Sequence, residues 1–585
     1  MCGIAGAMSR NGGAVDPALL QRMGQAQAHR GPDGQGQYRQ GDVGLAHQRL
    51  AIIDLVTGDQ PIFGPDGLVL IANGEIYNNP ELRAELGDVG FRTQSDCEPP
   101  LFLYQRLGLD FVGRLRGMYA LALHDPQQNR LVLCRDPFGI KPLYYAETAE
   151  AFLFASEPQA ILASGLVARQ EREEARDELL ALQFTTGRET IFAGIDRVLP
   201  GETLVIRGGR IIEQYRHPAL PLFAPRRLDE REGLAALDHC LAESVLIHQR
   251  SDVPYGMFLS GGIDSASLLA LMARLNSKPV LAFTAFFPGT RARDETDLAS
   301  KLAGELGAEH VRVPVEEEDF WSLLPDIAGA MDDPAADYAI LPTAKLAMTA
   351  RGAVKVVLAG EGGDELFGGY GRYRAYSRPW PFARALRRHS VLAELGLLRR
   401  ESSSWRQGLT QLEESLRSAP LSRLQRAQAI DCADWLPNDL LGKLDRCLMA
   451  FGLEGRVPFL DKQVADLAFR LPDRLKIRDG RGKYLLRRWL QQNLPSAEPF
   501  SRKRGFTVPV ADWLAAKPQL GRLLAAQPAI QAVCPPGAVE GLFAHLDQRR
   551  GFAAWLLLFY ALWHRRHIEG VAPGGTIFET LGERG

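Results

Sequence analysis

The sequence lacks the features that mark several large classes of protein. Its 68 lysines and arginines against 70 aspartates and glutamates leave a net charge of −2, so it has no positive excess for gripping nucleic-acid phosphates. Its longest nearly pure apolar run, residues 552–563, is shorter than the roughly 20 residues that a membrane-spanning helix needs. We therefore expect neither nucleic acid nor a membrane among its partners.

Cysteine is scarce, and the N-terminus has neither the basic segment nor the apolar segment of a secretory signal. We therefore expect a cytoplasmic protein. The cysteines are odd in number, widely spread and without a CxxC pair, which favours neither a disulfide framework nor a zinc site. They are seven residues: Cys2, Cys97, Cys134, Cys240, Cys432, Cys447 and Cys534.

What the chain does have is length and an ordinary globular composition. With 46% hydrophobic and 24% charged residues it is not disordered, and 585 residues indicate several domains. Short β-type runs separated by turns fill the first 160 residues, with helices expected at 17–28 and 100–107. This pattern is typical of a strand-rich α+β domain. The runs are 44–54, 68–73, 119–124, 130–134 and 152–155, followed by a strand pair at 202–206 and 210–214.

A proline-rich segment divides the chain. Three prolines within residues 217–225 disfavour helix and central strand, so we place a linker at 216–228, after a domain at 2–215. In the second domain, residues 229–567, helices and strands alternate, which predicts a doubly wound parallel sheet. The expected elements are helix 231–249, strand 255–259, helix 266–275, strand 280–286, helix 297–306 and strand 354–358.

Beyond about residue 375 helical periodicity dominates and β signals fade. Two arginine-rich stretches, 384–388 and 399–406, are interpreted as solvated helix faces. The Gly-rich segment 568–585 is predicted to be a flexible tail.

Cys2 can combine a nucleophile and a base in one residue. Removal of the initiator Met would leave its α-amine free beside its thiol, and that amine can accept the thiol proton. Polar residues at strand ends and turns suit cleavage of an amino-acid side-chain amide. Arg49 can clamp a carboxylate, Asn73 and Gly74 can form an oxyanion hole, and Asp96 can bind an ammonium group. Taken singly, these residues are better explained as a surface ion pair, a hairpin turn and a helix cap.

Six blocks in this half resemble the glutaminase domain of glutamine-hydrolysing asparagine synthetases. The resemblance implies an N-terminal-nucleophile hydrolase fold with four αββα layers. It implies Cys2 as nucleophile, Asn73 and Gly74 as the oxyanion hole, Arg49 as the clamp for the glutamine carboxylate, and Glu75 and Asp96 as contacts of its α-amino group. The blocks are MCGIAG at 1–6, HRGPDG at 29–34, RLAIID at 49–54, NGEIYN at 73–78, SDCE at 95–98 and RDPFGIKPL at 135–143.

Two Gly-rich segments follow predicted strands of the second domain. The segment LSGGIDS, residues 259–265, stands between a strand and a helix, where its backbone and hydroxyls can cradle phosphate. The segment AGEGGDELFGGY, residues 359–370, carries three carboxylates suited to Mg²⁺ shared with phosphate oxygens. A capped turn and a solvated acidic turn are the plainer alternatives. The chain has no GxxxxGK[ST] phosphate loop.

These segments also resemble the asparagine synthetase family, whose synthetase domain is an ATP-pyrophosphatase-type fold. The similarity continues through residues 449–461, 482–487 and 503–506. It implies ATP as substrate, Mg²⁺ on Asp264 and Asp364, Glu361 near the acyl intermediate, and Lys483 at the departing phosphate. The implied ATP and pyrophosphate contacts are Leu259, Ser260, Gly261, Gly262, Asp264, Ser265 and Gly360.

The resemblance implies a ligase that adenylates a carboxylate and amidates it with ammonia from glutamine, most simply aspartate to asparagine. Two alternatives stay open: the same chemistry on another acid, such as a sugar acid, a peptide carboxylate or a ring-closing substrate, and a nucleotide-binding scaffold without turnover. The sequence does not determine the acceptor, and a homodimer is kept open as the assembly.

Overall fold

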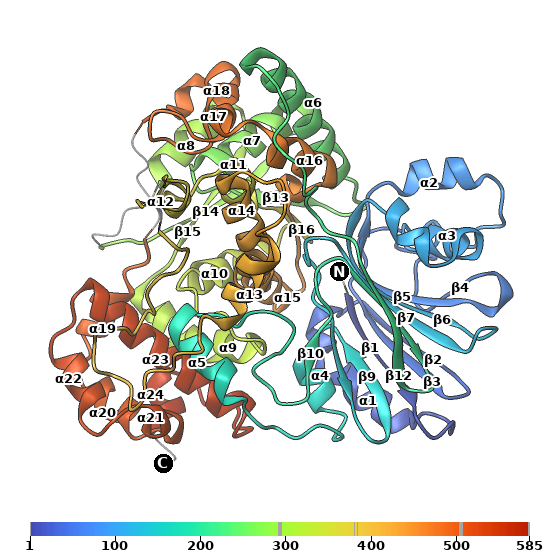
Figure 1. Cartoon of the computed structure of the whole chain (residues 1–585), viewed down its shortest axis with the longest axis horizontal. Helices are drawn as coiled ribbons and strands as arrows, with labels where there is room; N and C mark the ends of the chain where they lie inside the picture. The colour runs from blue at the N-terminus through green and yellow to red at the C-terminus, as the bar shows by residue number, and fades with distance from the viewer. Residues whose placement is uncertain (1, 291–294, 380, 383, 502–506, 583–585) are drawn as a thin grey trace.

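The computed structural model describes residues 2–290, 295–379, 381–382, 384–501 and 507–582. The block at 503–506 that contributes to the family resemblance lies outside these residues. Figure 1 shows a strand-rich N-terminal part beside a larger helix-rich part. Strand β12 (Arg210–Arg216) ends the first part, and helix α6 (Glu230–His248) begins the second.

Two six-stranded antiparallel sheets form the N-terminal half. Their strand orders are β10-β8-β9-β1-β3-β2 and β12-β11-β7-β6-β5-β4. The bounds are β1 (Cys2–Ser9), β2 (Gly34–Gln40), β3 (Val43–Arg49), β4 (Ile62–Phe63), β5 (Val69–Ile76), β6 (Gly117–Asp125), β7 (Arg130–Arg135), β8 (Tyr144–Glu147), β9 (Ala151–Ala155), β10 (Asp196–Arg197) and β11 (Glu202–Arg207).

Alternating side chains make these sheets the middle of a four-layer structure. Inward residues of both sheets, including Ile4, Ile71 and Phe152, form one buried cluster. The outer face of the second sheet packs on α2 (Asn79–Leu86) and α3 (Pro99–Leu107). The first sheet packs on α1 (Pro17–Ala26) and α4 (Pro158–Leu162). The αββα prediction is confirmed.

Five strands of this half escaped the sequence patterns, namely β1, β2, β4, β8 and β10, and the two longest show why. Strand β1 is buried along nearly its whole length and rich in Gly and Ala, so it shows no alternation and has Ile4 as its one β-branched residue. Strand β2 is mostly exposed and carries three glutamines among its seven residues. Pairing with β3 on both of its edges, rather than local propensity, defines them.

A five-stranded parallel sheet organises the second half, in the order β15-β14-β13-β16-β17. In Figure 1, α6 and α7 lie on one side of this sheet and α10 and α15 on the other, as a doubly wound sheet requires. The bounds are β13 (Tyr255–Phe258), α7 (Ile263–Leu275), β14 (Leu281–Phe286), α8 (Thr296–Glu305), β15 (Glu309–Pro314), α10 (Ile340–Ala350), β16 (Val356–Leu358), α15 (Gly442–Met449) and β17 (Glu454–Arg456).

Three expectations for the C-terminal third are wrong. Strand β17 pairs in parallel with β16, although β signals were expected to fade; three residues are too few for a periodic pattern. Residues 384–388 and 399–406 form turns rather than helices, and Arg387 pairs with the buried Asp431. The segment expected to be a flexible tail contains helix α24 (Ile577–Gly582), which buries Ile577 and Leu581.

Helices dominate this third, as predicted. The longest, α23 (Gln548–His567), is buried along most of its length against α9 (Glu317–Ala330) and α19 (Val510–Ala515). Among the residues that the structure describes, no helix has the length and apolarity to cross a bilayer.

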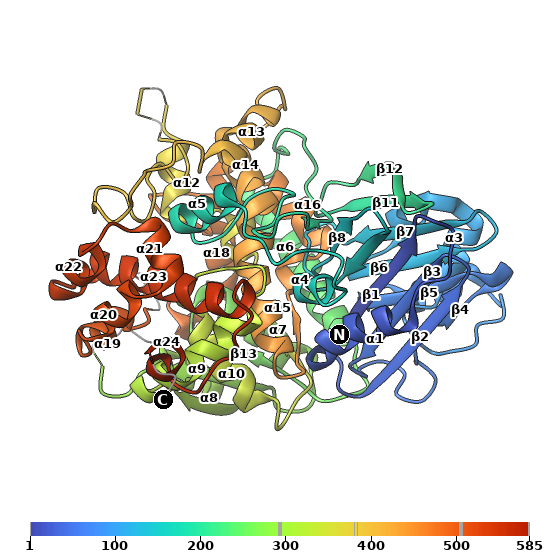
Figure 2. The same ribbon diagram turned by 90° about the horizontal axis from the view of Figure 1, so that it is seen from below.

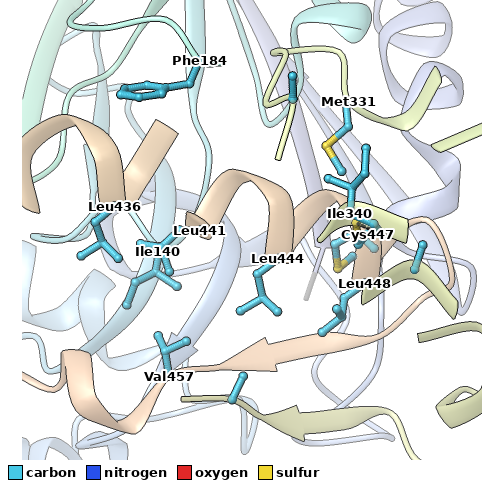
Figure 3. Close-up of a cluster of buried hydrophobic side chains, with 14 of the residues drawn as sticks. Ile140, Phe184, Met331, Ile340, Leu436, Leu441, Leu444, Cys447, Leu448 and Val457 are labelled. Atoms are coloured by element: carbon cyan, nitrogen blue, oxygen red, sulfur yellow. Dashed lines mark hydrogen bonds between the residues drawn. The ribbon is translucent and has the colours of Figure 1, made fainter. Parts of the chain in front are cut away.

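The two halves share one hydrophobic core. Helix α5 (Glu173–Leu182), from the N-terminal half, contacts α23, and Figure 1 and Figure 2 both place it among the helices of the second half. Figure 3 shows Ile140 of the N-terminal half beside Leu436 and Leu441 of the second half, within one buried cluster. This shared core fixes the position of one candidate site relative to the other.

Candidate active site

Cys2 begins strand β1, directly opposite Arg49 of the neighbouring strand β3. Its backbone nitrogen donates to Asn73 Oδ1 at 3.1 Å. The amide nitrogen Nδ2 of Asn73 is buried and has no hydrogen-bond partner among the described residues. Asn73 thus accepts a hydrogen bond from Cys2 N through Oδ1, and its Nδ2 group remains as a donor beside the thiol. Burial raises the pKa of the Cys2 thiol, and the nearby Arg49 charge opposes this rise.

The other predicted glutaminase residues lie around this cysteine. Arg49 donates to Asp59 at 2.7 Å and to the carbonyl oxygen of Asp54 at 2.5 Å. Asp96 accepts from the backbone nitrogen of Ile76 at 2.7 Å. The predicted carboxylate clamp thus lies on the strand paired with that of Cys2, and one predicted ammonium contact is bonded at the end of β5 in the second sheet, three residues after Asn73.

Gly74 allows two strands to approach closely beside this site. A Cβ atom there would lie 2.2 Å from the carbonyl oxygen of Met118 and 2.6 Å from Tyr119 Cα. Both are backbone atoms that cannot move aside cheaply, so any larger residue would push β5 away from β6. The position keeps Asn73 and Glu75 in register on either side.

Glu75 is completed by the second half of the chain. Its carboxylate lies 3.2 Å from the guanidinium of Arg456, which belongs to β17. Arg456 also pairs with Glu454 at 2.5 Å and donates to the carbonyl oxygen of His248 at 2.9 Å. Burial and the Asp96 carboxylate raise the pKa of Glu75, and Arg456 opposes them. The second half of the chain thus supplies charge to the group of residues around Cys2.

The predicted phosphate cradle forms a tight loop between β13 and α7. The hydroxyl oxygens of Ser260 and Ser265 lie 3.1 Å apart, and Gly262 N donates to Ser260 Oγ at 3.2 Å. Gly261 has a φ of +76°, a conformation that glycine adopts without strain. Leu259 anchors the loop, since its carbonyl oxygen accepts from Thr284 Oγ1 at 2.6 Å.

Two aspartates and a lysine converge beside this loop. Lys483 Nζ pairs with Asp264 and, at 2.7 Å, with Asp364 Oδ1. Burial alone would lower the pKa of Lys483, but the two carboxylates raise it above its ordinary value, so the ammonium stays charged. Lys483 itself has a φ of +58°, and a Cβ at Gly369 would lie 1.8 Å from Asp364 Oδ1. The absence of a side chain at Gly369 therefore leaves room for the Asp364 carboxylate beside Lys483.

The phosphate loop and the two aspartates border a cavity of about 320 Å³ at the carboxyl ends of β13 and β16, and Lys483 lies behind the aspartates rather than on its wall. Gly360 and Glu361 line it from the loop after β16; Gly360 packs so closely that a Cβ there would lie 3.1 Å from Asp264 Cβ. Burial raises the pKa of Glu361, and Lys443 opposes this rise. A cleft at strand ends is where open α/β sheets bind ligands. Of the predicted phosphate and carboxylate residues, those on its wall are Leu259, Ser260, Gly262, Asp264, Ser265, Gly360, Glu361 and Asp364.

Comparison with known proteins bears directly on this pair of sites. Residues 236–565 match the family model for asparagine synthase, and residues 1–216 match that for a glutamine amidotransferase domain. The chain belongs to the asparagine synthase family. It is a ligase of the glutamine-dependent amidotransferase type found in that family.

The relatives of this asparagine synthase family member are similar over most of its length. It is 34% identical to asparagine synthetase [glutamine-hydrolyzing] 1 of Bacillus subtilis, covering 88% of each chain. It is also 34% identical to a putative asparagine synthetase of Mycobacterium bovis, covering 97% of this chain and 98% of the relative. A third relative, amidase chry2 of Gibberella zeae, is 33% identical over 65% of this chain and 61% of the relative.

Three charged residues at the two sites were not predicted from the sequence. Arg456 lies in the block at 449–461, which contributed to the resemblance without a role for any residue. Lys443 lines the cavity and resembles an ordinary helix lysine in sequence. Arg30 donates to the carbonyl oxygen of Cys2 at 3.1 Å and to Asp445 at 2.8 Å. Only tertiary contacts distinguish these side chains from surface charges.

Proposed function

We propose that the protein hydrolyses glutamine at Cys2 and transfers the ammonia to an adenylated carboxylate, with aspartate as acceptor. The products are asparagine, glutamate, AMP and pyrophosphate. The observation that carries this proposal is the Asp264–Lys483–Asp364 triad beside a phosphate-cradling loop, in the same chain as an N-terminal cysteine. Relatives named asparagine synthetase support the choice of aspartate.

In the glutaminase half, removal of Met1 makes the nitrogen held by Asn73 an α-amine. This amine accepts the thiol proton of Cys2, and the sulfur attacks the side-chain amide carbon of glutamine. Asn73 Nδ2 and the backbone N–H of Gly74 stabilise the oxyanion. Ammonia leaves, and water hydrolyses the thioester to glutamate. Arg49 binds the α-carboxylate, and Glu75 and Asp96 bind the α-ammonium group.

In the synthetase half, a carboxylate oxygen of the acceptor attacks the α-phosphorus of ATP, and pyrophosphate leaves. Residues 259–265 and Gly360 hold the phosphates through backbone and hydroxyl groups. Lys483 offsets the charge that develops on the leaving pyrophosphate. Ammonia then attacks the acyl carbon near Glu361, and AMP leaves.

Asp264 and Asp364 fit a magnesium ion. Their carboxylates already converge on one cation, the Lys483 ammonium, so the geometry accommodates positive charge between them. Among the described residues, no three His, Cys, Asp or Glu side chains gather as a metal cage. Two carboxylates suit Mg²⁺, which takes much of its shell from phosphate and water. Bound there, Mg²⁺ would supply positive charge at the pyrophosphate.

The cellular setting follows from the thiols. All seven cysteines are free and buried, which fits a reducing compartment, and we propose the cytoplasm. The homodimer stays a prediction.

Release of AMP with ATP, ammonia and single acids tests the acceptor. We expect AMP with L-aspartate and equimolar asparagine. AMP with another acid and none with aspartate would overturn the aspartate assignment. The relative named an amidase makes a non-aspartate acceptor the second candidate.

A further inference from the structure

A second cavity, separate from the synthetase cavity, lies where the two halves of the chain meet. Its volume is about 90 Å³, and the linker and both halves contribute to its wall. Tyr77, Tyr119 and Phe138 come from the first half, and His248 and Leu460 come from the second. None of the predicted site residues, all of which the structure describes, lies on this wall. We call it the junction cavity.

Two tyrosines on the wall of the junction cavity have buried hydroxyl groups without a hydrogen-bond partner among the described residues. Tyr77 is 3% exposed and Tyr119 is 1% exposed. Burial raises the pKa of both, so each hydroxyl keeps its proton and can donate a hydrogen bond. The ring of Tyr77 packs on that of His248, with centroids 4.1 Å apart. Because buried hydroxyls normally have partners, this pair indicates a ligand that accepts hydrogen bonds.

Arg135 adds a buried positive charge to the same wall. It is 3% exposed and forms no ion pair with another described residue. Its guanidinium donates to the carbonyl oxygens of Lys141 at 2.7 Å, Val198 at 2.7 Å and Gly139 at 2.9 Å. The adjacent Asp136 carboxylate accepts from backbone N–H groups instead. A guanidinium has more N–H donors than these three bonds use, and a buried charge without a counter-ion in contact favours a bound anion.

The neighbouring groups on the wall leave this positive charge in place. Arg116 pairs with Asp461 at 2.7 Å, so these two charges offset each other. Burial lowers the pKa of His248 to about 4, so its ring is neutral at pH 7. Lys462 is exposed and adds a second positive charge that has no ion pair within the described part of the chain. Apolar side chains such as Phe138 form much of the remaining wall.

We propose that the junction cavity binds a short-chain monocarboxylate, a small anion with an apolar body. The hydroxyls of Tyr77 and Tyr119 and the remaining donors of Arg135 are the partners for its carboxylate. Phe138 and Leu460 are the contacts for its apolar body. The volume limits the ligand to a few carbon atoms, since an apolar cavity of about 150 Å³ holds one benzene molecule. Because both halves form the wall, the bound acid stabilises the folded junction.

Three probes of equal chain length test the class of ligand on the full-length wild-type protein. Sodium butyrate, butanamide and 1-butanol differ only in their head groups, and isothermal titration calorimetry measures their affinities. We expect butyrate to bind at least about tenfold more tightly than either neutral probe, the lower end of the range for a hydrogen bond to a charged group. Absence of butyrate binding, or equal affinities for the three probes, would overturn the proposal.

The variants Tyr77→Phe and Tyr119→Phe each remove one hydroxyl and keep the ring. We expect each to weaken butyrate binding about tenfold and to leave 1-butanol binding within about threefold of wild type. The matched control is Tyr373→Phe. Tyr373 is fully buried and its hydroxyl also has no partner among the described residues, but it is not on the wall of the junction cavity. Wild-type affinity in all three variants would contradict the site.

Competition separates the junction cavity from the two candidate sites, which are also expected to bind carboxylates. Butyrate is titrated into the Cys2→Ala protein, which should not hydrolyse glutamine, with saturating L-glutamine and L-aspartate present. Unchanged affinity for butyrate supports a separate site. Displacement by either amino acid assigns butyrate to a candidate site and overturns the inference. Neither result bears on the proposed amide synthesis, so the inference and the proposed function can fail independently.

Discussion

The two candidate sites are built in opposite ways. In the glutaminase half the functional residues sit on or beside antiparallel strands and are already tied to their neighbours, as Cys2 is to Asn73. In the synthetase half they line an open cavity at the ends of parallel strands, and their charges balance one another across Asp264, Lys483 and Asp364. Register thus organises the first site, and sheet topology organises the second.

The two sites are also in direct contact with each other. Arg456 lies beside Glu75 in the glutaminase site but belongs to the sheet of the synthetase half. The two sites therefore differ in construction without being structurally independent. Four substitutions test how far the two sites depend on each other and on burial.

Replacing Cys2 with alanine should give the largest difference between the activities of the two sites. We expect glutamine-dependent AMP release to fall at least about ten-thousand-fold, because the nucleophile is gone. Ammonia-dependent release should keep its wild-type rate. Parallel assays with glutamine and ammonium chloride check this, and an equal loss with both nitrogen sources would contradict separate sites.

Replacing Lys483 with alanine makes the converse test. Two aspartates would lose the ammonium between them, and the leaving pyrophosphate would lose its counter-charge, so AMP release should fall about a thousandfold with either nitrogen source. Glutamine hydrolysis, measured as glutamate, should persist. Its disappearance would show that Lys483 also supports the glutaminase site.

Replacing Arg456 with methionine tests the contact between the halves. The change leaves the carboxylates of Glu75 and Glu454 buried without their cation, which should lower the free energy of unfolding by about 3 kcal/mol. Denaturant unfolding measures this. The control is Arg226→Ala, which removes a half-exposed pair with Asp466 and should change stability little. Equal stabilities of the two variants would contradict the buried role of Arg456.

The smallest expected effect is a pH dependence within the glutaminase half. Burial lowers the pKa of His47 to about 3, against an unfolded value near 6.5. The unfolded chain binds the proton first, so stability falls as pH drops below about 6.5. Between pH 7 and pH 5 this histidine costs about 2 kcal/mol. Unfolding of His47→Gln at both pH values should show a loss smaller by that amount, and an unchanged loss would refute the prediction.

Much of the fold was predictable because its signals are local. The runs at 130–134 and 152–155 correspond to β7 and β9, and the helix at 231–249 corresponds to α6 within a residue of each end. Strands β1 and β17 were not predictable, because a Gly- and Ala-rich strand and a three-residue strand have no pattern of their own. Their partners β3 and β16 define them.

The candidate residues divide in the same way. Cys2 and the loop at 259–265 stand out in sequence because a terminal thiol and a Gly-rich turn between strand and helix are unusual in themselves. Asn73, Lys483 and the acids after β16 emerged from the family resemblance and from their positions after predicted strands. Arg456 lies in a block of the resemblance, but nothing in the sequence marks its role, since a buried charge and an exposed one have the same letter.

Sequence alone specifies the near-neutral charge, the cysteine at position 2, the two kinds of secondary-structure pattern and the family. Tertiary structure alone decided which charges meet. Arg456 contacts Glu75, several hundred residues away in the chain. Lys443 contacts Asp337, about one hundred residues away. Burial then turns such meetings into strong interactions, because a charge removed from water must find a partner within the fold.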